Sequence, residues 1–195
     1  EVFGTKQPDG SFEPFHTYTM KQSIAEGFTL DVLSNYVSYK RYFNISMDGQ
    51  DYEVPSAKAK KKIIREVVLE DQLNIQQTVE IMLDNYIEKV VDEINGKARA
   101  MIVVPYRKDC VVYFKEVNKQ LQDRQSQINC LVGFSGEVKL DGETFTEKGL
   151  NATVGHDGDV PIGLKYPQNR IVVVANKYQT GFDEPKLQAM YVNKP

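Results

Sequence analysis

The sequence is poor in the residues that build metal centres and disulfide frameworks. Its 195 residues include 2 cysteines and 2 histidines, and His16 and His156 lie far apart with no cysteine near either of them. A zinc site is therefore not expected, and we predict no bound metal. Cys110 and Cys130 stand in no metal-like spacing, and a single disulfide between them is possible on paper. Two reduced, buried thiols are the favoured interpretation.

The sequence also lacks an excess of positive charge and any long hydrophobic run. The formal net charge is −3 and the sequence pI is about 5.5, so contact with nucleic acid would have to come from local patches. Apolar runs such as residues 171–175 are far too short to cross a bilayer, and the polar residues 1–10 are unlike a signal peptide. We therefore expect a cytoplasmic protein without a membrane partner.

Three nucleotide and hydrolase motifs are missing as well. The sequence contains no G-x-x-x-x-G-K-[ST], which cradles phosphates, no G-x-G-x-x-G and no G-x-S-x-G. A small nucleotide-binding regulator, a dinucleotide enzyme and an α/β-hydrolase are therefore disfavoured. Hydrophobic residues make up 41% of the chain and aromatic residues 10%, which indicates a folded globular protein and not a disordered one.

The second half of the chain has a β-α-β pattern. Its continuous apolar runs predict strands separated by a helix over residues 108–122, and such strands form a parallel sheet covered on both faces. The fold class is therefore α/β. Between residues 141 and 169 no helix is recognisable, and we expect a long loop. The predicted strands are residues 100–104, 128–134, 171–175 and 189–192.

The first half has weaker signals. A loop with a turn at residues 8–10 precedes a predicted strand at 15–19 and a helix at 20–26, which Thr19 caps and Gly27 ends. A long helix is expected from the cap Asn74 to Ile94, and its apolar face could be core or interface, with core favoured. Further elements are expected as a helical turn at 30–33, a strand at 37–45 and a helix at 57–69.

Polar residues follow three of the predicted strands. The carboxyl ends of parallel strands share one edge of a sheet, and a helix start attracts phosphate, so these residues favour a phosphate-binding or nucleic-acid-binding edge. Each group alone fits an ordinary turn as well. The basic run at residues 58–62 fits a solvated helix face better, because no aromatic residue interleaves with it. The three groups are Arg107 with Lys108, Ser135 with Gly136, and Thr180, Gly181 and Asp183.

Four long strings carry a resemblance to a known family: PFHTYTMKQSIAEGFTLDVLSNYVSYKRYF, GKARAMIVVPYRKDCVVYF, LVGFSGEVKLDGETFTEKGLN and IVVVANKYQTGFDEPKLQAMYVNKP. They cover most of the chain, and the sequence resembles the motor (R) subunit of type I restriction enzymes, a superfamily 2 DNA translocase. That family has two RecA-like lobes, with ATP in the cleft between them and duplex DNA tracked across their edges. The resemblance thus implies an α/β, RecA-like second helicase lobe preceded by a strand and helix linker.

The resemblance also implies a domain order and residue roles. Residues 1–47 would join lobe one to lobe two, 48–96 would form a helical linker, and 97–195 would be most of lobe two. Residues 101–107 look like helicase motif IV and KYQTGFD looks like motif V. DNA contacts are then expected from Arg107, Lys108, Ser135, Gly136, Thr180 and Gly181, and Gln179 and Asp183 are expected near the nucleotide or the inter-lobe cleft.

Several parts of the family pattern are missing from this sequence. The nuclease domain, the phosphate loop, the acidic magnesium-binding motif and the arginine-bearing motif VI are absent, so we expect a piece of a longer protein with no catalytic residue of its own. ATP and Mg²⁺ would belong to the complete protein, which would be a DNA-translocating endonuclease of a restriction system. Its partners would be double-stranded DNA and the modification and specificity subunits. A non-enzymatic α/β protein-interaction module is the alternative.

Overall fold

The structure, a computed structural model, describes residues 4–28 and 72–194. The chain divides into two compact units, Glu1–Tyr52 and Glu53–Pro195, and each is described by itself. The elements predicted at 30–33, 37–45 and 57–69, and the basic run at 58–62, lie outside the described residues.

The first unit contains a short hairpin followed by a capped helix. Strands β1 (Gly4–Lys6) and β2 (Phe12–Pro14) pair antiparallel, which corrects the expected loop, while residues 15–19 form no strand, contrary to the prediction. Helix α1 (Met20–Ala25) begins as expected, with Thr19 Oγ1 accepting from Gln22 N at 3.1 Å in a capping box. Gly27 has φ 76°, so the predicted left-handed helix end is confirmed.

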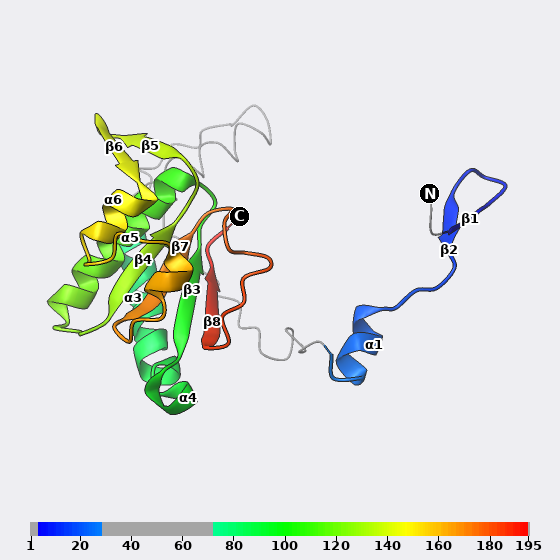
Figure 1. Cartoon of the computed structure of the whole chain (residues 1–195), viewed down its shortest axis with the longest axis horizontal. Helices are drawn as coiled ribbons and strands as arrows, with labels where there is room; N and C mark the ends of the chain where they lie inside the picture. Colours follow the sequence, from blue (N-terminus) through cyan, green and yellow to red (C-terminus); the bar gives the residue numbers. More distant parts are fainter. Residues whose placement is uncertain (1–3, 29–71, 195) are drawn as a thin grey trace, which may run out of the picture. The chain divides into compact units, whose positions relative to one another are not determined.

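The second unit is built on a parallel sheet of four strands in the order β4-β7-β3-β8 (Figure 1). Val103 pairs with Val174 on one side and Val192 on the other, and Gly133 also pairs with Val174. The carboxyl ends of all the strands therefore align at one edge. This confirms the predicted α/β class and is consistent with a RecA-like fold. The strands are β3 (Arg99–Val103), β4 (Asn129–Gly133), β7 (Asn169–Val174) and β8 (Leu187–Val192).

Alternate residues of each strand point to opposite faces of the sheet, and apolar side chains on both faces pack against helices. On one face, Ile102, Val132 and Val173 pack in a cluster with residues of α3 (Gln72–Asn85), the π-helical turn η2 (Tyr86–Val90) and α5 (Arg107–Asp123). On the other face, Met101, Leu131 and Val172 pack with Val160 and Leu164, around the short helix α7 (Val160–Gly163). A buried Leu or Ile side chain contributes about 1.5–3 kcal/mol here.

The long helix differs from its prediction at both ends. It already includes Gln72, and Asn74 lies inside it, buried, with its carbonyl accepting from Thr78 Oγ1 at 2.6 Å, so Asn74 is not the expected cap. After η2 comes α4 (Glu93–Gly96), in which Ile94 and Asn95 are left-handed at φ 52° and 55°. The apolar face is core, as favoured, because Val79, Leu83 and Tyr86 are at most 1% exposed.

Residues 137–163 are structured, which corrects the expected long loop. Strands β5 (Glu137–Leu140) and β6 (Glu143–Thr146) form a hairpin, and α6 (Glu147–Ala152) follows directly. The hairpin turn uses Asp141 at φ 53° and Gly142 at φ 80°, the positive angles that a two-residue turn between twisted strands requires. Thr146 Oγ1 then caps α6 by accepting from Gly149 N at 3.0 Å.

Among the residues that the structure describes, the outer edge of β4 is covered by side chains and not by another strand. Edge strands present unpaired N–H and C=O groups to any neighbouring chain, and native proteins block them. Here the side chains of two asparagines and one glutamate take the outward-facing groups of alternate residues. The pairs are Cys130 with Asn118 (2.9 and 3.1 Å), Val132 with Asn151 (2.8 and 3.0 Å) and Phe134 N with Glu147 (2.7 Å).

Cys110 and Cys130 are free and fully buried at 0% exposure, which confirms the predicted reduced thiols. Burial in apolar surroundings raises the pKa of both thiols. Within residues 4–28 and 72–194, no helix is long and apolar enough to cross a membrane. The same residues contain no cluster of His, Cys, Asp and Glu suited to a metal ion.

Candidate nucleic-acid interface

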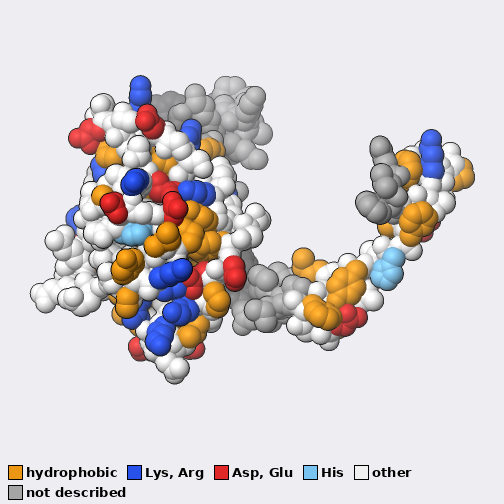
Figure 2. Space-filling view, viewed as in Figure 1, with side chains coloured by type: hydrophobic (Ala, Val, Ile, Leu, Met, Phe, Trp, Pro, Cys, Tyr) orange, Lys and Arg blue, Asp and Glu red, His pale blue; other side chains and the backbone are white. Residues whose placement is uncertain are grey.

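The candidate site is the edge of the sheet at which the strands end. Because all four strands run parallel in matched register, the residues that follow β3, β4 and β7 emerge at this edge. The structure therefore places the groups at 107–108 and 135–136 at this edge, whereas the loop that carries 179–183 leaves the edge and runs toward the start of β3, where Glu184 pairs with Arg99. Figure 2 shows acidic and basic side chains interspersed on the visible face of residues 72–194, so any attraction for anions has to be local.

Arg107 and Ser135 are in direct contact. Tyr106 is extended at φ −129°, and its N–H donates to Asp109 Oδ2 at 3.1 Å, which fixes the first turn of α5. Arg107, the first residue of the helix, donates from Nη1 to the Ser135 carbonyl at 2.9 Å. The guanidinium thus connects the residues after β3 with those after β4, and it retains further N–H donors for a phosphate.

Gly136 permits this contact. It has φ 75°, where a side chain is strained, and an added Cβ would lie 3.1 Å from Arg107 Nη1. The positive φ therefore favours glycine at this position.

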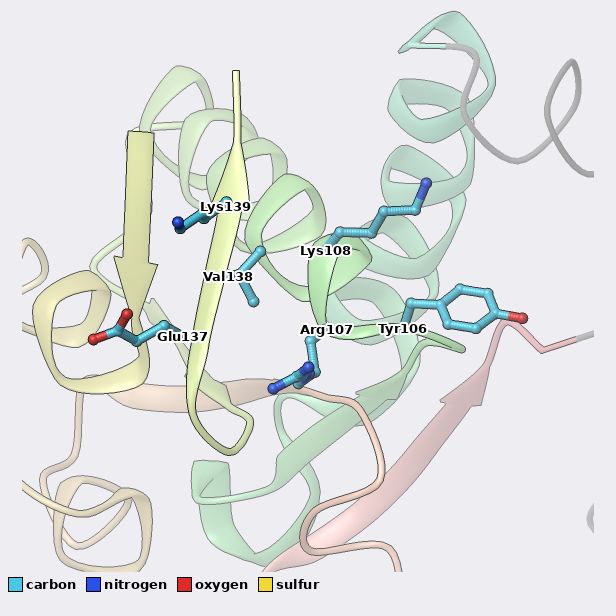
Figure 3. Close-up of a pocket in the computed structure, with 6 residues that line it drawn as sticks. All are labelled: Tyr106, Arg107, Lys108, Glu137, Val138 and Lys139. Atoms are coloured by element: carbon cyan, nitrogen blue, oxygen red, sulfur yellow. The ribbon is translucent and has the colours of Figure 1, made fainter. Parts of the chain in front are cut away.

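A shallow depression of about 340 Å³ lies beside Arg107. Figure 3 shows the Arg107 guanidinium on the side of α5 that faces β5, while Tyr106 and Lys108 extend away from β5. The residues that line it include 3 cations and 1 carboxylate, on a chain whose net charge is −3. Lys139 was not predicted as a site residue, because only the hairpin brings it here. The lining residues are Tyr106, Arg107, Lys108, Glu137, Val138 and Lys139.

The loop after β7 folds back against the sheet. Tyr178 is left-handed at φ 61°, its ring lies 5.0 Å from the Phe182 ring between centroids, and both belong to the apolar cluster on one face of the sheet. A Cβ at Gly133 would lie 2.9 Å from the Tyr178 ring, so the strand end needs glycine there. This packing leaves Thr180 and Gly181 exposed at the tip of the loop, with Gly181 at φ 67°.

Lys177 and Glu147 join this loop to the end of β4. Lys177 Nζ donates to Glu147 Oε1 at 2.9 Å and to Oε2 at 2.7 Å, and Oε2 also accepts from Phe134 N at 2.7 Å. Partial burial alone would lower the pKa of Lys177, but its hydrogen bonds to Glu147 raise that pKa above its usual range. Neither residue was predicted, since the sequence has no signal for a contact across 30 positions.

Gln179 and Asp183 lie on the same loop. Gln179 Oε1 accepts from Lys194 Nζ at 3.0 Å, whereas its Nε2 is buried and finds no acceptor among the described residues. A buried donor without a partner costs about 1–3 kcal/mol, so Gln179 Nε2 is suited to donate to a ligand oxygen. Asp183 is exposed.

Comparison with known proteins gives one distant relative. No family model matches the chain. A protein of Methanocaldococcus jannaschii, described as the endonuclease subunit of the type I restriction enzyme MjaVIIIP, is 22% identical over 202 aligned positions, which cover 91% of this chain and 20% of the relative. The chain is distantly similar to a restriction-enzyme subunit. It spans about a fifth (20%) of the length of that relative.

Proposed function

We propose that the chain is part of the DNA-translocating motor of a type I restriction enzyme and contributes the DNA-backbone face of its second RecA-like lobe. Residues 97–195 would form most of that lobe, 48–96 a helical linker, and 1–47 the connection from lobe one. The parallel α/β sheet and the similarity along 91% of the chain support this assignment. Double-stranded DNA and the modification and specificity subunits would be its partners.

The observation that carries the proposal is the Arg107–Ser135 contact beside the depression. Phosphate contacts position a protein on a duplex without reading its sequence, and arginine suits them because its planar fork binds phosphate oxygens in pairs. Arg107 and Lys108, the first two residues of α5, bring positive charge to the helix start at this edge. Ser135 and Gly136 would meet the backbone beside Arg107, and the exposed Thr180 and Gly181 would meet it from the next loop.

ATP hydrolysis is assigned to the complete protein. It requires a lysine, magnesium ligands and an arginine finger that stabilise charge on the transferred phosphoryl group. This sequence has no G-x-x-x-x-G-K-[ST] motif, so we expect no turnover from the chain alone. Gln179 and Asp183 would lie toward the nucleotide or the inter-lobe cleft, and the spare Gln179 amide supports such a role.

The alternative is a non-enzymatic interaction module that docks a protein partner through its exposed sheet edge or its long helix, and the packing of the long helix does not favour the second route. The apolar face of α3 packs into the core, where Val79 and Leu83 are at most 1% exposed. We therefore retain DNA-backbone binding as the function to test.

The test is a salt titration of binding to a labelled 20-base-pair duplex by fluorescence anisotropy. Three phosphate contacts predict weak affinity of ~10⁻⁴ to 10⁻⁶ M and a slope of log K against log salt near about −2.7, or roughly −0.9 per contact. Arg107→Ala is expected to weaken binding equally for all sequences and to bring the slope to about −1.8. Lys165→Ala serves as the matched control, because Lys165 is exposed near the start of β7, at the opposite edge.

Three results would contradict the proposal. One is binding without salt dependence, another is a strong preference for one sequence, and the third is an equal loss of affinity for Lys165→Ala and Arg107→Ala. DNA-stimulated ATP hydrolysis by the purified chain would separately overturn the assignment of turnover to the complete protein.

A further inference from the structure

One carboxylate connects the two loops that the proposed function assigns to DNA. Glu147 is the first residue of α6, and its side chain is 14% exposed. It accepts from Phe134 N, directly before Ser135, and from Lys177 Nζ, directly before Tyr178. The loop after β4 and the loop after β7 are therefore held by the same group.

These bonds are strong ones. Hydrogen bonds to an ionised acceptor are about twice as strong as neutral ones, and a partly buried pair is weakly screened by salt. Removing the carboxylate would leave a backbone N–H at the β4 edge and a half-buried ammonium without their acceptor, so both loops would lose their anchor together.

The contacts on either side continue the connection. Ser135 accepts from Arg107 Nη1 at 2.9 Å, which links Glu147 to the first turn of α5 through a single intervening peptide. On the other side, the Tyr178 ring lies against Gly133, and Thr180 follows at the exposed tip. A phosphate that binds Arg107 and displaces its guanidinium would therefore weaken the hydrogen bond to the Ser135 carbonyl. Movement of Ser135 would in turn alter the hydrogen bond between Phe134 N and Glu147.

We propose that Glu147 is a positioning residue that couples the two loops: it fixes residues 134–136 and 176–181 in one arrangement, and it transmits DNA binding at Arg107 to the Tyr178 loop. The coupling itself follows from the contacts alone, whereas the transmission of DNA binding rests on the proposed function. The two parts are tested by separate measurements.

The first measurement needs no DNA. Lys177→Met removes one partner of Glu147 without touching the other, so a coupled Phe134 amide should exchange its hydrogen about tenfold faster and shift in the ¹⁵N–¹H spectrum. In Glu147→Gln the exchange rate and chemical shift of the Phe134 amide should already be altered. Adding Lys177→Met to this variant should change them little further. Glu143→Gln, on the exposed strand β6, is the matched control and should leave the Phe134 amide unchanged.

The second measurement uses fluorescence. The sequence contains no tryptophan, so Tyr178→Trp creates a single reporter in the loop after β7. Adding the 20-base-pair duplex should shift its emission, and the shift should fall by roughly two-thirds or more in Tyr178→Trp with Glu147→Gln but persist with Glu143→Gln. Circular dichroism confirms that each variant is folded, and the amide measurement keeps Tyr178 intact.

The outcomes separate the two ideas. If hydrogen exchange and the chemical shift of the Phe134 amide are unchanged in Lys177→Met, the coupling is overturned, regardless of the result with DNA. A coupled amide in a protein that fails to bind duplex supports the coupling while defeating the proposed function. Duplex binding with an emission shift that is the same in Glu147→Gln overturns the transmission.

Discussion

Replacing Asn151 by alanine tests how the edge strand β4 is closed. The Asn151 side chain is fully buried, at 0% exposure, and pairs with both the N–H and the C=O of Val132, at 2.8 and 3.0 Å. Alanine would leave both backbone groups buried without a partner, and each such group costs about 1–3 kcal/mol. The free energy of unfolding should therefore fall by roughly 2–6 kcal/mol, a large part of the ~5–15 kcal/mol typical of a domain.

Urea unfolding followed by circular dichroism measures this loss. Asn129→Ala is the matched control, since Asn129 lies at the start of the same strand and its side chain makes longer bonds, at 3.4 and 3.3 Å, while being partly exposed. It should cost about 1 kcal/mol or less. Asn151→Asp should also be destabilising, because a carboxylate can accept from Val132 N but cannot donate to Val132 O. A loss for Asn151→Ala no larger than for Asn129→Ala would refute the reasoning.

Two further predictions concern buried positions. Cys110 and Cys130 should react with a thiol reagent at pH 8 only after unfolding, because burial raises the pKa of both above the ordinary 9.0. The folded state therefore retains these protons as the unfolded state loses them, and stability should fall above pH 9 by roughly 1 kcal/mol per thiol per pH unit. Urea midpoints between pH 8 and 10 that do not decline would contradict this. Gly133→Ala should displace the Tyr178 ring and weaken duplex binding in the anisotropy assay, and an affinity equal to that of the unmodified chain would contradict this.

The sheet could be predicted because its strands are almost wholly buried. Residues 171–174 are at most 1% exposed, and such a strand needs a continuous apolar run that the sequence shows directly. Parallel strands end at the same edge of a sheet, and this predicted that Arg107 and Ser135 lie close together, as their contact shows. Thr180 lies farther along, in the exposed part of the loop after β7, where the alignment of strand ends no longer fixes its position.

The hairpin and the short helices at 137–163 could not be predicted, because tertiary contacts hold them. Asn151 stabilises α6 against β4 through two hydrogen bonds to Val132, and no local pattern announces such a pairing. The link through Glu147 has the same origin. The prediction that Asn74 caps the long helix was wrong for a different reason. Asparagine is common at helix starts, but Asn74 lies buried inside α3.

The side chains along β4 also determine at which edge of the sheet a further strand can be added. On that flank the N–H and C=O of Cys130 and Val132 and the N–H of Phe134 are already bonded to side chains. We therefore expect an extra strand, from a longer polypeptide or from another subunit, to extend the sheet alongside β8.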